Sequence, residues 1–213
     1  GRSGGGADLI PRPTADLADH TDFGPAGIPA EVVVRTFTIT NTGSADLTLG
    51  AVTVSGPHSS DFTVTLQPVS PVVFTRTFQV TFDPSGVGLR SATLSFTNDD
   101  LDESPFDFSI QGSGFVPSSN ADLSGLTPST GTLVPAFAPA TVGYASGVPS
   151  GVSSLTVTPT VDEGHATIEV RVNGGAYQAV ASATASAPLS LNAGPNPVEV
   201  RVTAQDLVTQ KIY

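Results

Sequence analysis

The sequence predicts an all-β protein built as two tandem antiparallel β-sandwiches. The chain has 22 glycines and 18 prolines among 213 residues, with abundant Thr, Val and Ser, which is typical of short strands joined by many turns. Apolar and polar residues alternate in several segments, whereas no segment of a dozen residues keeps the spacing of an amphipathic helix. A length of 213 residues is sufficient for two domains, each with its own core.

The first domain is predicted at residues 16–114, after a Gly-rich segment at residues 1–15. Alternation predicts its strands near residues 36–40, 74–82, 92–97 and 106–111. We expect five apolar residues to face its interior: Phe78, Val80, Phe82, Leu94 and Phe96. Phe74 and Arg76 share the face of Phe78, and Arg76 is expected near a strand end, with its guanidinium reaching solvent or an acidic partner.

The alternation of apolar and polar residues changes phase within residues 47–54 of the first domain. Leu47 and Leu49 have one parity, whereas Val52 and Val54 have the opposite one. Such a change is what a bulge or bend at Gly50-Ala51 would produce.

A Pro/Ser-containing stretch at residues 115–121 predicts a linker, and the second domain follows at residues 122–213. Its strands are expected around residues 142–144, 155–157, 167–172, 189–191 and 198–202. Asn173–Gly175 predicts a type I′ hairpin turn, since Asn and Gly tolerate the positive φ that this turn demands. Residues 209–213 resemble the opening of a further strand, so the final strand is expected to be truncated.

The amino-acid composition disfavours or excludes several classes of partner and site for this chain. The formal net charge is −11 with a single lysine, which disfavours nucleic acid as a partner. The absence of cysteine excludes disulfides, zinc thiolate sites and cysteine nucleophiles. No apolar run of 18 residues or signal-peptide pattern is present, so we expect no membrane insertion. Because the chain lacks methionine, we expect a processed product or a piece of a longer polypeptide.

Two stretches resemble known families. Residues 16–114 resemble the ASPM/SPD-2/Hydin-like, or choice-of-anchor D, immunoglobulin-like modules of large bacterial surface proteins, through "DHTDFG", "RTFTITNTGSADLTL", "SDFTV", "FQVTFDPSGVGLRSATLSF", "NDD" and "FSIQGSG". Residues 121–213 resemble the bacterial cadherin-like β-sandwich module, through "LSGLTPSTGTLVPAFAPATVGY", "VTPT", "ATIEVRVNG" and "VEVRVTAQD". The resemblance implies non-catalytic immunoglobulin-like sandwiches of an exported, secreted or cell-surface protein.

The chain departs from both families at its outer strands. The first family begins with a short strand that is missing here, and the second ends with a strand that runs past Tyr213. Unpaired sheet edges recruit strands from neighbouring copies or from the rest of a longer chain. We therefore expect protein partners, with Leu9 and Ile10 as anchors of a donor segment, and Lys211, Ile212 and Tyr213 as the edge that receives a strand.

Three polar clusters are candidate sites. His58, Ser59 and Asp61 are the residue types of a hydrolase triad, but residues this close on an extended chain point in different directions, so we expect a turn. Asp162, Glu163 and His165 could bind a metal, although a polar turn before the next strand accounts for them better. The loop "NDDLDES" is either a Ca²⁺ site or a solvated acidic loop. Its candidate ligands are Asp99, Asp100, Asp102 and Glu103.

No catalytic constellation is evident, and we expect neither an enzyme nor a bound cofactor. The first hypothesis is a structural module of a bacterial cell-surface stalk, adhesin or filament. The alternative is a carbohydrate- or protein-binding accessory module of a secreted multidomain enzyme. Zero tryptophans and three tyrosines favour the first, since sugar platforms use exposed Trp or Tyr rings.

Overall fold

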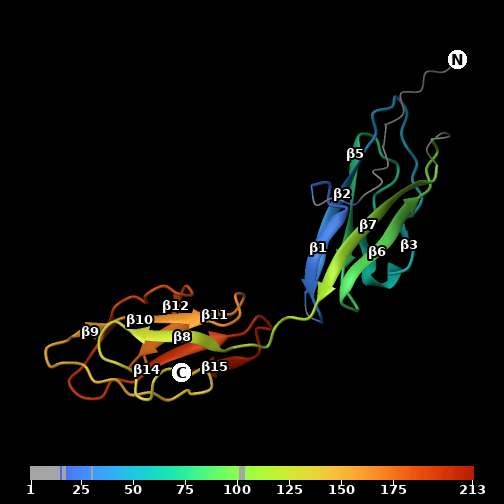
Figure 1. Cartoon of the computed structure of the whole chain (residues 1–213). Coiled ribbons are helices and arrows are strands. Elements are labelled where there is room, and N and C mark those ends of the chain that lie inside the picture. The colour runs from blue at the N-terminus through green and yellow to red at the C-terminus, as the bar shows by residue number, and fades with distance from the viewer. Residues whose placement is uncertain (1–14, 16–17, 30, 101–103) are drawn as a thin grey trace. The chain divides into compact units, whose positions relative to one another are not determined.

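The computed structural model describes residues 15, 18–29, 31–100 and 104–213, and the chain divides into two compact units between Val116 and Pro117. Both units consist of β-strands, and a short 3-10 turn, η1 (Ser59–Asp61), lies in the first (Figure 1). The predicted all-β class and the pair of sandwiches are confirmed.

The first unit packs two sheets face to face. The spatial order of one sheet is β1 (Asp22–Gly27), β7 (Phe106–Phe115), β6 (Gly88–Phe96) and β3 (Thr53–Ser55). The order of the other is β2 (Val33–Thr40), β5 (Thr75–Phe82) and β4 (Phe62–Leu66). The described strand pairs of this unit are antiparallel except β1–β7, which is parallel.

The core of the first unit lies between the alternating faces of these strands. The five residues predicted to face inward are all buried: Phe78, Val80, Phe82, Leu94 and Phe96. Phenylalanine rings from both sheets fill the space, with Phe37 stacked on Phe78 at a centroid distance of 5.1 Å. Phe74 was expected on the same face, but its side chain is 75% exposed because it precedes β5 and lies beyond the end of the sheet.

The phase change at residues 47–54 marks a crossing between the two sheets. Leu47 bridges to Val72, just before β5, whereas Leu49 bridges to Asn98, just after β6. Gly50 donates its N–H to the carbonyl of Thr97 at 2.8 Å, and a Cβ at this position would collide with the Thr97 hydroxyl. The bend predicted at Gly50 is therefore a site of close backbone approach.

Strand β1 was not predicted, because its sequence "DFGPAG" carries the Gly and Pro of a turn. It nevertheless pairs with β7, with a shift of register between Asp22 and Pro25. β1 therefore forms the outer strand of this sheet, next to β7.

The second unit contains three described sheets (Figure 1). The largest has the order β12 (Gln178–Val180), β11 (Thr167–Val172), β14 (Val198–Thr203) and β15 (Gln210–Ile212). Two small sheets pair β10 (Val157–Val161) with β8 (Leu123–Pro128), and β13 (Leu189–Ser190) with β9 (Ser154–Leu155).

The predicted hairpin turn between β11 and β12 is confirmed. Asn173 and Gly174 have φ of 52° and 70°, and the N–H of Gly175 bonds to the carbonyl of Val172. The prediction of a regular strand at residues 142–144 is wrong, since these residues form no strand and the adjacent Ala145 makes only an isolated bridge to Val134.

The last strand is well paired in the structure. β15 runs antiparallel to β14, and the backbone N–H and C=O of Tyr213 both bond to Val200 at 3.0 Å. The pairing therefore continues through Tyr213.

Candidate functional site

Lys211, Ile212 and Tyr213, which were expected to form a receiving edge, lie on β15 or directly after it, and β15 is an outer strand of its sheet. Lys211 donates from Nζ to the Asp122 carboxylate and to the Pro139 carbonyl, both at 2.7 Å. The hydrogen bond to Asp122 raises the pKa of Lys211. The Tyr213 ring is buried in the core, whereas Ile212 is 46% exposed. Leu9 and Ile10 lie outside the described residues.

The expected turn at His58 to Asp61 has a structural role. Asp61 is buried and faces Arg90, which donates from Nε to Oδ2 at 2.5 Å, and Ser85, which donates to Oδ1 at 2.7 Å. His58 instead accepts the backbone N–H of Ser91 at Nδ1. Burial raises the pKa of Asp61, but the hydrogen bonds and charge of its partners outweigh burial and the net pKa is lowered. These contacts form a buried ion pair rather than a proton relay.

The remaining candidate polar residues are also used locally. Glu163 accepts the backbone N–H and the ring Nδ1 of His165, which lowers the pKa of Glu163. Asp162 accepts from the amide of Asn120 at 2.8 Å. Arg76 donates to its neighbouring carbonyl, that of Thr75.

Two of the four candidate calcium ligands, Asp99 and Asp100, lie among the described residues. The Asp99 carboxylate accepts the N–H of Thr48 at 2.8 Å, and hydrogen bonding by Thr48 lowers the pKa of Asp99. Asp102 and Glu103 lie outside the described residues. Within the described part of the chain, no cluster of three or more His, Cys, Asp or Glu side chains could hold a metal ion.

If the loop is only a solvated connection, millimolar Ca²⁺ will leave the melting temperature nearly unchanged, since a ligand stabilises only by occupying the native state. Thermal unfolding with and without Ca²⁺ measures this directly. A rise of several degrees that the double variant Asp100→Ala, Asp102→Ala abolishes would establish a calcium site instead.

Three loops meet at one end of the first unit, and we call residues 41–48, 67–74 and 98–100 the loop end. Asn41 holds two of them together, because its backbone N–H donates to the Phe74 carbonyl at 2.7 Å and its side-chain amide donates to the Val72 carbonyl at 2.9 Å. Asp99 caps Thr48 from the third loop. The loops are therefore fixed against one another by backbone and side-chain hydrogen bonds.

The loop end carries exposed apolar side chains. Val69, Val73 and Phe74 are 66%, 40% and 75% exposed, and all three belong to the connection between β4 and β5. Exposed apolar patches mark contact sites more often than single exposed residues do. This patch was not predicted from the sequence, because Phe74 has the same parity as the buried Phe78. The nearby Pro71 was the available signal that the strand had not yet begun.

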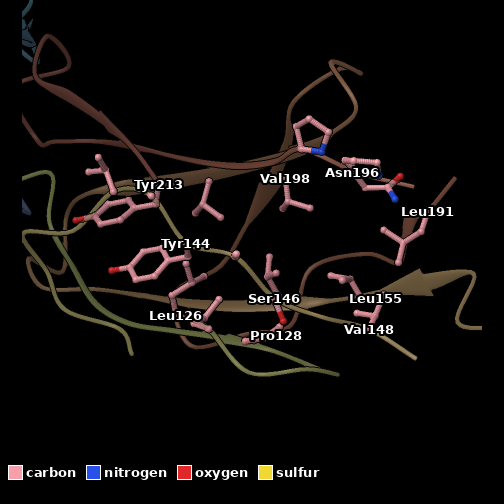
Figure 2. Close-up of a pocket in the computed structure, with 18 of the residues that line it drawn as sticks. Leu126, Pro128, Tyr144, Ser146, Val148, Leu155, Leu191, Asn196, Val198 and Tyr213 are labelled. Carbon is pink, nitrogen blue, oxygen red and sulfur yellow. The ribbon is translucent and has the colours of Figure 1, made fainter. Parts of the chain in front are cut away.

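A groove lies in the second unit (Figure 2). Its volume is about 370 Å³, and Figure 2 shows Tyr144 and Tyr213 at one end and Leu191, Leu155 and Val148 toward the other. None of its lining residues is Asp, Glu, Lys, Arg or His. Part of its lining comes from residues 133–148, which form no regular strand.

The charged residues on β11 and β14 pair with one another away from the groove. Arg171 donates to Glu199 at 2.7 Å, and Arg201 donates to Glu169 at 2.5 Å. The Tyr177 ring lies against both guanidinium groups, at 4.4 Å from Arg171 and 3.9 Å from Arg201. The hydrogen bond from Arg171 lowers the pKa of Glu199, which keeps this carboxylate ionised within the network.

Comparison with known families accounts for both units. Residues 13–113 match the HYDIN/CFA65/VesB-like, Ig-like domain, and residues 119–213 match the cadherin-like beta sandwich domain. The chain is an Ig-like domain followed by a cadherin-like domain. Both resemblances expected from the sequence are confirmed, and we use these names for the two units below.

A curated bacterial relative and two solved structures are similar to the chain. "Putative membrane protein" of Evansella cellulosilytica is 37% identical over 89 residues, which are 42% of this chain and 13% of that protein. The secreted serine protease VesC of Vibrio cholerae is 14% identical, with a TM-score of 0.35, over 88% of this chain and 46% of that one. The ASH/PapD-like domain of human CEP192 is 16% identical, with a TM-score of 0.34, over 53% of this chain and 96% of that one. Neither structural likeness is close enough to carry a functional argument.

Proposed function

We propose that the chain is a non-enzymatic structural part of an exported bacterial cell-surface protein, and that the loop end of the Ig-like unit is its contact surface for a second copy. The observation that carries this proposal is the exposure of Phe74, 75%, on a loop held by its neighbours. A rigid loop presents an aromatic side chain at low entropic cost, and such residues dominate the energy of protein contacts.

A second copy is a suitable occupant because an apolar patch is complementary to itself. In an isologous contact the same surface meets on both partners, so Phe74 and Val69 of each copy would cover those of the other. The exposed residues Asp46 and Asp99 lie in the same three loops and would face like charges across that contact. Association should therefore strengthen as salt screens this repulsion.

The aromatic residues favour a protein partner over a carbohydrate. Tyr144 and Tyr213 use their hydroxyls within the cadherin-like unit, where Tyr144 donates to the Thr141 carbonyl and Tyr213 to the Pro139 carbonyl. Tyr177 lies against Arg171 and Arg201. The three tyrosine rings are thus occupied, and the exposed ring is that of Phe74, which offers a sugar no hydrogen bond.

The cell-surface location is supported by two facts. The bacterial relative carries the description "Putative membrane protein", and the first unit resembles modules of large bacterial surface proteins, as noted from the sequence. In the part of the chain that the structure describes, no helix has the length and apolar character needed to span a bilayer.

Sedimentation equilibrium of the full chain tests the proposal. We expect the average mass of the wild type to rise with concentration, with a dissociation constant on the order of 0.1–1 mM because the patch is small. Phe74→Ser should abolish the rise. Val87→Ser is the matched control, since Val87 is 64% exposed in the turn between β5 and β6, outside the loop end. A wild type that stays monomeric, or a Phe74→Ser variant that associates equally well, would overturn the proposal.

A further inference from the structure

We infer that the groove of the cadherin-like unit is a binding site for a small, uncharged, apolar molecule, namely a hydrocarbon chain or ring. A volume of about 370 Å³ lies within the range of pockets that bind small molecules, and the lining is mainly aliphatic and aromatic. This inference is independent of the contact surface proposed for the Ig-like unit.

The charge distribution excludes an ionic ligand. The chain carries a net charge of −11, yet no charged residue lines the groove. A ligand charge would lose its hydration on entering this surface and would meet no opposite charge there. The ligand class is therefore neutral.

The polar side chains of the groove are mostly occupied. The Asn196 amide donates to the carbonyls of Asn192 and Gly194, and its oxygen accepts from Asn173. The Tyr144 hydroxyl bonds to the backbone at Ala138 and Thr141. Among the described residues, the Ser146 hydroxyl has no hydrogen-bond partner, and Ser146 lies near the middle of the groove in Figure 2, so the ligand is largely hydrocarbon with room for one polar group.

The backbone of the groove disfavours an extended peptide. Ala145 uses both its N–H and its C=O on Val134, and Val200 uses both of its groups on Tyr213. The N–H of Val157 donates to the Ser186 hydroxyl. A peptide strand laid in the groove would find no free sheet edge at these positions, and its own amides would be buried without partners. A small molecule without amides incurs no such cost.

The fluorescent probe N-phenyl-1-naphthylamine, which is neutral and apolar, tests the site in the full chain. We expect saturable enhancement of its fluorescence, with a dissociation constant on the order of 100 µM, as is typical of a ligand of this size. Unlabelled 1-decanol should displace the probe by competition.

Two variants locate the binding. Gly143→Leu adds bulk to a residue that lines the groove, where a Cβ would meet no atom within 4 Å, and Val148→Asp adds a charge to the lining. Each should weaken probe binding at least tenfold. Gly164→Leu is the control, since Gly164 has equal free space and lies in the turn before β11. Thermal unfolding verifies that all three variants are folded.

The hydrocarbon could belong to a free molecule or to a membrane lipid. Sedimentation with phosphatidylcholine vesicles separates these sources: capture that Val148→Asp abolishes identifies a lipid chain, and no capture alongside probe binding identifies a free ligand. The inference would be overturned if the wild type did not enhance the fluorescence of the probe. It would also be overturned if folded Val148→Asp and Gly143→Leu variants enhanced it as much as the wild type does.

Discussion

Replacing Asp61 with alanine is expected to destabilise the Ig-like unit by about 3–5 kcal/mol, which is the range found when one partner of a buried ion pair is removed. The Asp61 side chain is fully buried, that of Arg90 is 19% exposed, and Ser85 completes the hydrogen bonding of the carboxylate. The variant would leave the guanidinium partly buried without its partner. For a unit of this size the melting temperature should fall by more than roughly 10 °C.

Denaturant unfolding of the full chain, with the transition of each unit resolved, measures this loss. Asp83→Ala is a suitable control, because the Asp83 side chain is exposed and only its backbone N–H bonds to the Asp61 carbonyl. A loss below about 1 kcal/mol for Asp61→Ala would mean that the pair is solvated and contributes as little as a surface ion pair.

The same carboxylate makes the stability of the Ig-like unit depend on pH. Its folded pKa is lowered from the ordinary value of 3.8. The stability that the ionised Asp61 carboxylate adds to the folded unit is therefore fully present above the unfolded pKa, and it is lost as the pH falls through the folded pKa. In Asp61→Asn, this component of the acid destabilisation below about pH 4 should be absent.

Phe78→Ala is expected to cost roughly 3–5 kcal/mol, as large-to-small substitutions of buried phenylalanine do. Phe78 is 1% exposed and stacks on Phe37, so the substitution leaves a cavity between the two sheets. Thr77→Ala should cost far less, because Thr77 faces solvent from the same strand. Equal losses for the two variants would contradict the observed register of β5.

Alternation was sufficient to predict five core residues of the Ig-like unit, Phe78, Val80, Phe82, Leu94 and Phe96. In β5 every second side chain is buried from Phe78 onward, and the pairing of β2 with β5 keeps the same faces together. The pattern works because burial on one face of a strand is a local property with a period of two residues. Asn173-Gly174 was equally predictable, since the backbone demand of the turn is met by those two residues alone.

The candidate sites were less predictable because they depend on contacts between distant segments. Asp61 meets Arg90 across 29 residues, and no local pattern announces this pair. Phe74 has the parity of a core residue and is exposed only because the sheet ends before it. Part of the groove lining comes from residues 133–148, which form no regular strand, although alternation around Val142 and Tyr144 indicated one.

The most direct test of the proposed contact function is the concentration dependence of the backbone amide NMR spectrum of the full chain, from about 0.02 to about 1 mM, which spans the expected dissociation constant. The account predicts shifts that grow with concentration at residues 41–48, 67–74 and 98–100, and that vanish in Phe74→Ser. A spectrum that does not change with concentration, or changes confined to the cadherin-like unit, would contradict it.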